Sequence, residues 1–101
     1  MENILLFKEA GSAEAKDNRL TSEIVDISAV NNTVFYHVTG DWAGAEARVE
    51  IRKYGHDVWM PIEETRTTEN NVPLILDLRY GCEIRIVITG VAADTKLTAS
   101  L

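Results

Sequence analysis

Apolar and polar residues alternate with a period of two along most of this chain. The alternation is clearest over residues 47–51, 74–78 and 84–88. A period of two places successive side chains on opposite faces of a strand, so each stretch predicts a half-buried β-strand. No run of ten or more residues shows helical spacing. Strands recur about every eight to twelve residues, which indicates an all-β sandwich or barrel.

Turn signals separate the predicted strands. Asn31-Asn32, the segment 54–57 and Tyr80-Gly81 carry residues that favour tight turns. Pro61 lacks a backbone N–H and is expected at a sheet edge or a strand end. Residues 63–71 are polar and predict a loop. The fold prediction is therefore all-β: a single β-sandwich or jelly roll of about eight short antiparallel strands.

The first eighteen residues break this pattern. They begin with a short apolar run. Residues 9–18 follow, which are small or polar and include no apolar residue larger than Ala. We expect an N-terminal arm and tether over 1–18, apart from a β-sandwich domain over 19–101. The apolar run is far too short for a signal peptide, and no segment approaches the length of a membrane-spanning helix. The apolar residues of the arm are Ile4, Leu5, Leu6 and Phe7.

The alternation also predicts which side chains form the core. Each such buried side chain contributes about 1.5–3 kcal/mol to folding. The expected core residues are Val25, Ile27, Val34, Tyr36, Val38, Val49, Ile51, Trp59, Leu74, Leu76, Leu78, Ile84, Ile86 and Ile88. Three apolar residues fall on outward positions instead, namely Phe35, Ile75 and Val87. They either contact another chain or are the scattered exposed apolar residues that any surface carries.

Composition narrows the classes of partner. The chain has 101 residues, which fits one domain, and its net charge is −6. An acidic chain is poorly suited to bind a phosphate backbone or an anionic membrane, so we expect neither a nucleic acid nor a membrane as partner. The acidic residues are scattered, which is typical of a charge that maintains solubility. The single cysteine, Cys82, permits no intramolecular disulfide.

No catalytic or metal-binding motif is found among these residues. His37 in a strand and His56 in a turn have no motif partner of the kind that a nucleophile or a metal site needs. We therefore expect no enzyme activity, no cofactor and no metal. Trp42, in the turn 40–44, either binds a sugar or a protein or plugs one end of the sandwich.

Several turn and strand motifs follow one another in the last two-thirds of the chain. They are G-D-W-A-G-A at 40–45, V-W-M-P at 58–61, G-C-E-I-R-I-V-I-T-G at 81–90 and T-K-L-T-A-S-L at 95–101. This succession resembles small β-sandwich structural proteins of tailed-bacteriophage virions. The resemblance implies a capsid decoration protein or a head or tail accessory protein, located in the virion and assembled in the host cytoplasm, without catalytic residues.

The resemblance also implies protein partners, namely other copies of the chain and a virion protein such as the major capsid protein. We expect a homo-oligomer, with a trimer as the first expectation, in which the arm adds a strand to a neighbouring subunit. The alternative is a carbohydrate- or ligand-binding β-sandwich module that uses Trp42 and Tyr54 as stacking platforms. The candidate contact residues are Ile4, Leu5, Leu6, Phe7, Phe35, Trp42, Ile75 and Val87.

Overall fold

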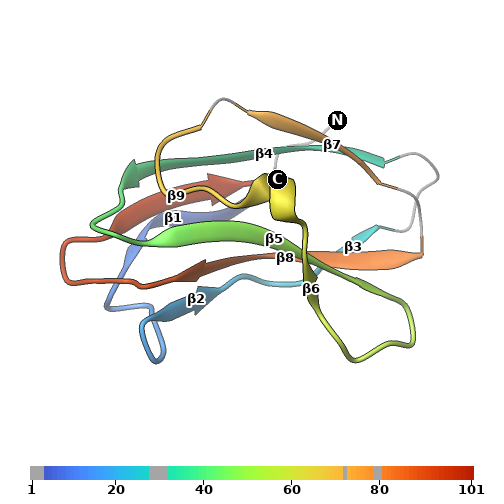
Figure 1. Ribbon diagram of the computed structural model, residues 1–101, viewed down its shortest axis with the longest axis horizontal. Helices are drawn as coiled ribbons and strands as arrows, with labels where there is room; N and C mark the ends of the chain where they lie inside the picture. Colours follow the sequence, from blue (N-terminus) through green and yellow to red (C-terminus); the bar gives the residue numbers. More distant parts are fainter. Residues whose placement is uncertain (1–3, 28–31, 72, 79–80) are drawn as a thin grey trace.

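In the computed structural model the chain forms two antiparallel β-sheets that pack face to face (Figure 1); residues 4–27, 32–71, 73–78 and 81–101 are described. One sheet has the strand order β1-β9-β4-β7 and the other the order β2-β8-β5-β6, with β3 also paired to β8. The strands are β1 (Leu5–Gly11), β2 (Arg19–Thr21), β3 (Val25–Ile27), β4 (Asn32–Asp41), β5 (Glu46–Lys53), β6 (Met60–Pro61), β7 (Leu74–Leu78), β8 (Cys82–Thr89) and β9 (Lys96–Ser100). The predicted all-β sandwich is confirmed.

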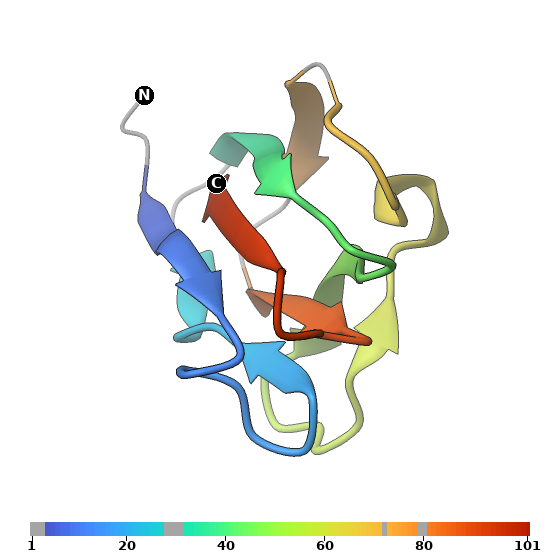
Figure 2. The same cartoon turned by 90° about the vertical axis from the view of Figure 1, so that its left-hand side faces the viewer.

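The strand order is that of a jelly roll, in which one long hairpin is rolled into two sheets. β2 and β3 lie one after the other against β8 and so act as a single interrupted strand. From the inside of the roll outward, β5 pairs with β6, β4 with β7, β2 and β3 with β8, and β1 with β9. Each pair wraps around the previous one, which distributes the strands over two sheets. Figure 2 looks along the strands and shows the two layers.

The core lies between the sheets and is built from the inward positions of the alternating pattern. Most predicted core residues are buried, and Val25, Ile51, Leu74 and Leu78 are partly buried against them. Tyr36 is fully buried, and its hydroxyl has no hydrogen-bond partner among the described residues. Burial, and to a smaller extent the charge of Glu46, raises the pKa of Tyr36 well above its usual range. The fully buried core residues include Ile27, Val38, Val49, Ile84, Ile86, Ile88, Leu97 and Leu101.

The N-terminal segment belongs to the sandwich and is not a separate arm. β1 pairs with β9 along its length, and Ile4 exchanges two backbone hydrogen bonds with Leu101, at 2.8 and 3.0 Å. Leu6 and Phe7 pack against the core. The predicted arm over 1–18 is therefore wrong for the described residues. Two register shifts in β1 explain the error, because bulges break the alternation while still turning apolar side chains inward.

The predicted turns and loops are reproduced where the structure describes them. The turn 54–57 joins β5 to β6, and Pro61 ends the edge strand β6. The loop that follows β6 contains one short 3₁₀ turn, η1 (Glu63–Thr65). The turns predicted at Asn31-Asn32 and Tyr80-Gly81 fall partly outside the described residues.

Two asparagine side chains continue the pairing along β4 in the segment just before β7 begins. The side chain of Asn71 accepts a hydrogen bond from the backbone N–H of Val38 at 3.0 Å. It also donates one to the backbone carbonyl of Tyr36 at 3.5 Å. The side-chain oxygen of Asn70 accepts from the backbone N–H of Gly40 at 3.0 Å and from the indole N–H of Trp42 at 2.9 Å. These amides occupy the positions that a paired strand would use, so this part of the edge of β4 is closed.

Candidate functional site

The outer face of the sheet β1-β9-β4-β7 gathers uncharged residues from all four strands. Leu5 on β1 lies opposite Ser100 on β9, and Ser100 lies opposite His37 on β4. Phe35 on β4 lies opposite Ile75 on β7. Alternation along each strand points these side chains away from the core. We call this surface the uncharged face, and it consists of Leu5, Phe35, His37, Pro73, Ile75 and Ser100.

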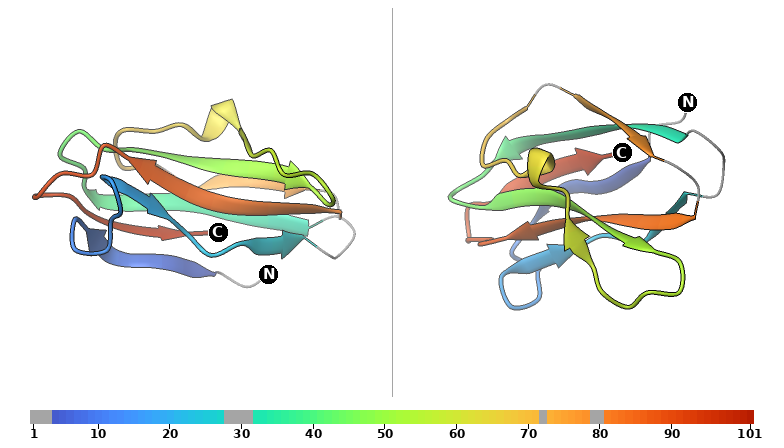
Figure 3. Two further views of the ribbon diagram at one scale, coloured as in Figure 1. Left: turned by 90° about the horizontal axis from the view of Figure 1, so that it is seen from below. Right: turned by 45° about the vertical axis from the view of Figure 1, so that its right-hand side comes forward.

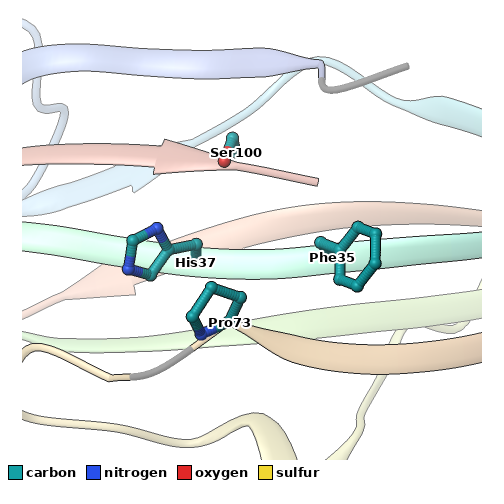
Figure 4. A pocket seen from close by; sticks show the side chains of 4 residues that line it. All are labelled: Phe35, His37, Pro73 and Ser100. Carbon is teal, nitrogen blue, oxygen red and sulfur yellow. The ribbon is translucent and has the colours of Figure 1, made fainter. Parts of the chain in front are cut away.

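A shallow hollow of about 290 Å³ lies on the uncharged face (Figure 4). Phe35 and His37 project side by side from β4, with Pro73 beside them and Ser100 on the neighbouring strand. Typical small-molecule sites have volumes of roughly 300–1,000 Å³ and several convergent polar groups. This hollow lies at the lower end of that range, and a single histidine is its one titratable lining residue. The other residues of its lining are Phe35, Pro73 and Ser100.

Charged residues border the uncharged face and leave its centre free. Asp41 and Lys96 lie opposite each other where β4 and β9 meet the end of the sandwich. Asp77 lies beyond Ile75 on β7, where its carboxylate accepts a hydrogen bond from the Thr33 hydroxyl at 2.8 Å. The centres of protein–protein interfaces are depleted in charged residues and enriched in aromatic ones. The uncharged face therefore has the composition of a contact surface.

Some predicted contact residues reach this surface and others do not. Ile75 faces outward as predicted and is 57% exposed, and Ile4 and Leu5 are also exposed. Leu6 and Phe7 instead pack against the core, because β1 completes the sheet. The apolar run at the start of the chain is thus divided between the surface and the core.

The outer face of the other sheet, β2-β8-β5-β6, is covered with ion pairs, and we call it the charged face. Glu50 lies at its centre and is only 5% exposed. Arg85 donates hydrogen bonds to one carboxylate oxygen of Glu50 at 2.7 and 2.9 Å, and Arg48 donates to the other at 3.0 Å. Arg19 lies 3.9 Å away. One carboxylate therefore organises three arginines from three strands.

This arrangement determines the protonation of Glu50. Burial alone raises the pKa of a carboxyl group, because it disfavours the charged form. The hydrogen bonds and positive charges of Arg85 and Arg48 outweigh burial, so the pKa of Glu50 lies below its usual value near 4.5. Glu50 is accordingly ionised throughout the neutral range and holds the two guanidinium groups in place.

Val87 lies on the charged face, but it is not a contact residue. It faces away from the core, as the alternation predicts, yet its exposed fraction is 0%. Its cross-strand neighbours are Thr21 and Arg48. Long arginine side chains cover apolar surface with their methylene groups while their charged ends remain in ion pairs. The prediction that Val87 forms an interface is therefore wrong.

Trp59 also lies on the charged face and not in the core, where the alternation places it. The guanidinium carbons of Arg85 and Arg52 lie 4.2 and 4.6 Å from the centre of its ring, which are cation–π distances. Arg52 additionally pairs with Glu83 at 2.9 Å. Strand β6 begins only at Met60, so the regular alternation does not extend to the tryptophan.

Trp42 lies in the turn between β4 and β5 and packs partly against the core, as the second of the two alternatives predicts. Its ring packs against the core, and its indole nitrogen donates to Asn70. Its carbonyl accepts a hydrogen bond from the Thr95 hydroxyl at 3.0 Å. With one side packed and its polar atom bonded, the ring is held as a structural element.

The hairpin between β5 and β6 carries exposed apolar residues, two of which, Val58 and Met60, were not assigned to a surface from the sequence. Val58 is 67% exposed and Met60 is 59% exposed, and Tyr54 is exposed at the start of the turn. Figure 3 shows that this loop extends away from the sheets. The sequence signal for these exposed residues was the apolar run directly before Pro61. Alternation alone assigns that run to a core strand, so the signal was missed.

The described residues contain no group of three His, Cys, Asp or Glu side chains that could hold a metal ion. His56 lies exposed in the β5–β6 turn, and Cys82 is partly buried against the core. Burial, and then the charge of Asp26, raises the pKa of the Cys82 thiol. No family model, curated protein or solved structure matches the chain. In the described part of the chain, no helix has the length and apolar character needed to cross a membrane.

Proposed function

We propose that this chain is a non-enzymatic structural protein of a phage virion, either a capsid decoration protein or a head or tail accessory protein, that acts through protein–protein contacts. The observation that carries the proposal is the uncharged face. Its side chains come from four strands and from Pro73 just before β7, and they include no Lys, Arg, Asp or Glu, although the chain has a net charge of −6. A surface that served only solubility would carry charges, as the charged face does.

The fold supports a role in rigid contacts. Leu5, Phe35 and Ile75 come from three strands of one hydrogen-bonded sheet, so their relative positions are fixed before any partner arrives. Side chains on strands are positioned more accurately than side chains on loops, and this lowers the entropic cost of binding. The motifs from residue 40 to the end of the chain, which resemble those of phage virion sandwiches, supply the class of partner: a major capsid protein and other copies of the chain.

The virion assignment is tested first, with purified phage particles. Virions purified on a density gradient from the phage that encodes this chain are expected to contain it in a fixed ratio to the major capsid protein, measured by quantitative mass spectrometry. Particles that lack the chain entirely would overturn the virion assignment. Genes for a major capsid protein, portal or tail beside the coding sequence would support the same class.

The contact surface is tested separately with two variants that add one negative charge each. Phe35→Glu places the charge on the uncharged face, and Thr21→Glu places it on the exposed edge of the charged face. Binding of the purified chain to particles stripped of it is expected to be lost for Phe35→Glu and retained for Thr21→Glu. The opposite result would move the contact surface to the charged face.

The carbohydrate-binding alternative is weakened but keeps one candidate residue. Trp42 is partly packed against the core and hydrogen-bonded, which reduces the ring surface that it could offer as a stacking platform. Tyr54 remains exposed on the β5–β6 hairpin. Glycan-array binding that disappears in Tyr54→Ala would favour this alternative over the virion role.

A further inference from the structure

The free edges of the two sheets differ in how well they are protected against pairing with another strand. A regular exposed edge is a template for strand addition, and proteins block such edges with bulges, prolines, short strands or charged residues. β1 has two register shifts, β6 is two residues long and ends in Pro61, and β2 and β3 are short and separated. Asn70 and Asn71 close the exposed part of β4. Within the described residues, β7 is the edge strand with the least such protection, which consists of one charged residue, Asp77.

β7 is regular over its whole length. All five of its residues pair in unbroken register with β4, from Leu74 opposite Tyr36 to Leu78 opposite Asn32. Its sequence, Leu-Ile-Leu-Asp-Leu, contains no proline and one charged residue. Such a strand has a high tendency to pair, because its apolar residues and extended backbone suit a pleated sheet.

The hydrogen bonds of β4 show which backbone groups of β7 face outward. The N–H of Val38 and the carbonyl of Tyr36 point to the β7 side, where Asn71 meets them. By alternation, the even-numbered residues of β4 bond to β7, and their partners there are Leu74, Leu76 and Leu78. The N–H and carbonyl groups of Ile75 and Asp77 therefore point away from the sheet, toward the free edge.

We infer that two copies of this chain pair antiparallel through β7, so that their β1-β9-β4-β7 sheets join into one continuous sheet. A two-fold axis through Leu76 places Ile75 of each copy opposite Asp77 of the other. The N–H and carbonyl of Ile75 then meet the carbonyl and N–H of Asp77, which gives four hydrogen bonds. Shifting the register by two residues places Pro73 opposite Asp77, and Pro73 has no N–H to donate. The register centred on Leu76 therefore keeps all four hydrogen bonds, whereas the shift toward Pro73 does not.

The side chains are compatible with this register. On the inner side, Leu76 meets its own copy and Leu74 meets Leu78, so the partly exposed leucines at the ends of β7 gain apolar contacts. On the outer side, the carboxylate of Asp77 faces an isoleucine, and the two Asp77 side chains are diagonal neighbours. Like charges directly opposite each other destabilise a strand pair, and the register centred on Leu76 avoids that arrangement. Donor meets acceptor along the backbone, and no two carboxylates face each other.

The pairing makes the assembly a closed dimer and not the trimer expected from the sequence. An antiparallel pair of identical strands is isologous, so each copy uses the same edge and no edge is left for a third. The two uncharged faces become parts of one surface of twice the area. This inference does not depend on the proposed virion role, since it concerns how two copies pair with each other and not what their joint surface binds.

The test compares two variants of one outward residue by analytical ultracentrifugation over a concentration series. Ile75→Pro removes the N–H that points to the free edge, and this position tolerates proline within one copy because that N–H has no partner among the described residues. Two of the four intermolecular hydrogen bonds are lost, so dimerisation is expected to weaken about a hundredfold. Ile75→Thr keeps the N–H and a β-branched side chain, and it is expected to remain dimeric within about tenfold of the parent chain.

Residue-resolved hydrogen exchange of the unmodified chain provides a readout that does not depend on a variant folding. The amides of Ile75 and Asp77 are expected to gain protection as concentration rises, while those of Leu74, Leu76 and Leu78 stay equally protected. A chain that is monomeric at millimolar concentration would overturn the inference. A dimer in which Ile75→Pro pairs as tightly as Ile75→Thr, or in which the two outward amides exchange freely, would also overturn it and assign self-association to another surface.

Discussion

The two outer faces of this sandwich are built on similar sheets and have opposite compositions. The charged face holds Glu50 among arginines and stacks Trp59 on two of them, so its polar groups are largely paired with one another. The uncharged face carries Phe35, which is half-buried, and Ile75, which is 57% exposed. The difference teaches that the two outer faces have different roles. The charged face stabilises the fold through contacts within the chain, and the uncharged face leaves apolar side chains open to a partner.

The largest effect is expected for Glu50→Ala, which removes the acceptor that organises the arginines. Arg48 and Arg85 are mostly covered and would be left without a carboxylate. Breaking such a pair is expected to lower the free energy of unfolding by about 2–4 kcal/mol, since these arginines still reach some water. Urea denaturation measures the change. Glu83→Ala, which breaks the more exposed pair with Arg52, is the control and is expected to cost about 1 kcal/mol or less. Equal losses would contradict the central role of Glu50.

Acid is expected to produce a smaller version of the same loss. The pKa of Glu50 is lower in the folded chain than in the unfolded one, so its contribution is complete above the usual value near 4.5. That contribution is lost as the pH falls through the lower folded value, by about 1.4 kcal/mol for each unit of difference between the two. The effect is smaller than that of the substitution, because a protonated carboxyl still forms hydrogen bonds. Unfolding measured from pH 7 to pH 2 should show a shallower decline for Glu50→Gln than for the parent chain.

Trp59→Ala is expected to cost about 1–2 kcal/mol, because it removes two cation–π contacts at a partly exposed site. Thermal unfolding measures the loss, and Trp59→Phe should recover part of it. Val58→Ala is the matched control one residue away, and its exposed side chain predicts a change within about 0.5 kcal/mol. A negligible effect of Trp59→Ala would mean that the stack does not stabilise the charged face.

The smallest effect is expected on the uncharged face. Ile75→Lys replaces an exposed apolar side chain, so the free energy of unfolding should change by no more than about 0.5 kcal/mol. Differential scanning calorimetry at low protein concentration isolates the single chain from any self-association. A loss comparable to that of Trp59→Ala would break the comparison, because both faces would then stabilise the fold.

The alternating pattern predicts the fold class and most of the core, because burial on one side of a strand is a local property. Val49 and Ile86 are examples, since their inward positions follow from their immediate neighbours. Trp59 and Val87 were placed wrongly because their surroundings depend on other strands. β6 is shorter than the alternation suggests, and Val87, which lies between Arg48 and Thr21 of the two paired strands, is fully buried. Such coverage follows from strand order, which periodicity does not contain.

Individual residues of the candidate site could be predicted from the sequence, but their arrangement on one surface could not. Phe35 and Ile75 could be assigned to outward positions from the sequence, but nothing local indicates that they lie opposite each other. The bulges in β1 concealed a strand that the sequence presents as an arm, and so they concealed the position of Leu5 beside Ser100. Segments that are distant in the sequence meet on one surface because of the jelly-roll topology. Their meeting can be recognised only once the strand pairing is known.

The rolled hairpin also sets the order in which the chain can fold. Glu50 and Pro61 are close in sequence and can meet early, whereas Leu5 meets Ser100 only after nearly the whole chain has been wound. The entropic cost of closing a loop grows with the separation of its ends, and domains dominated by distant contacts fold slowly. The pair β1–β9 is therefore expected to form last. During synthesis, the apolar residues of β1 remain unpaired until β9 has left the ribosome, so the sandwich cannot close before β9 is made.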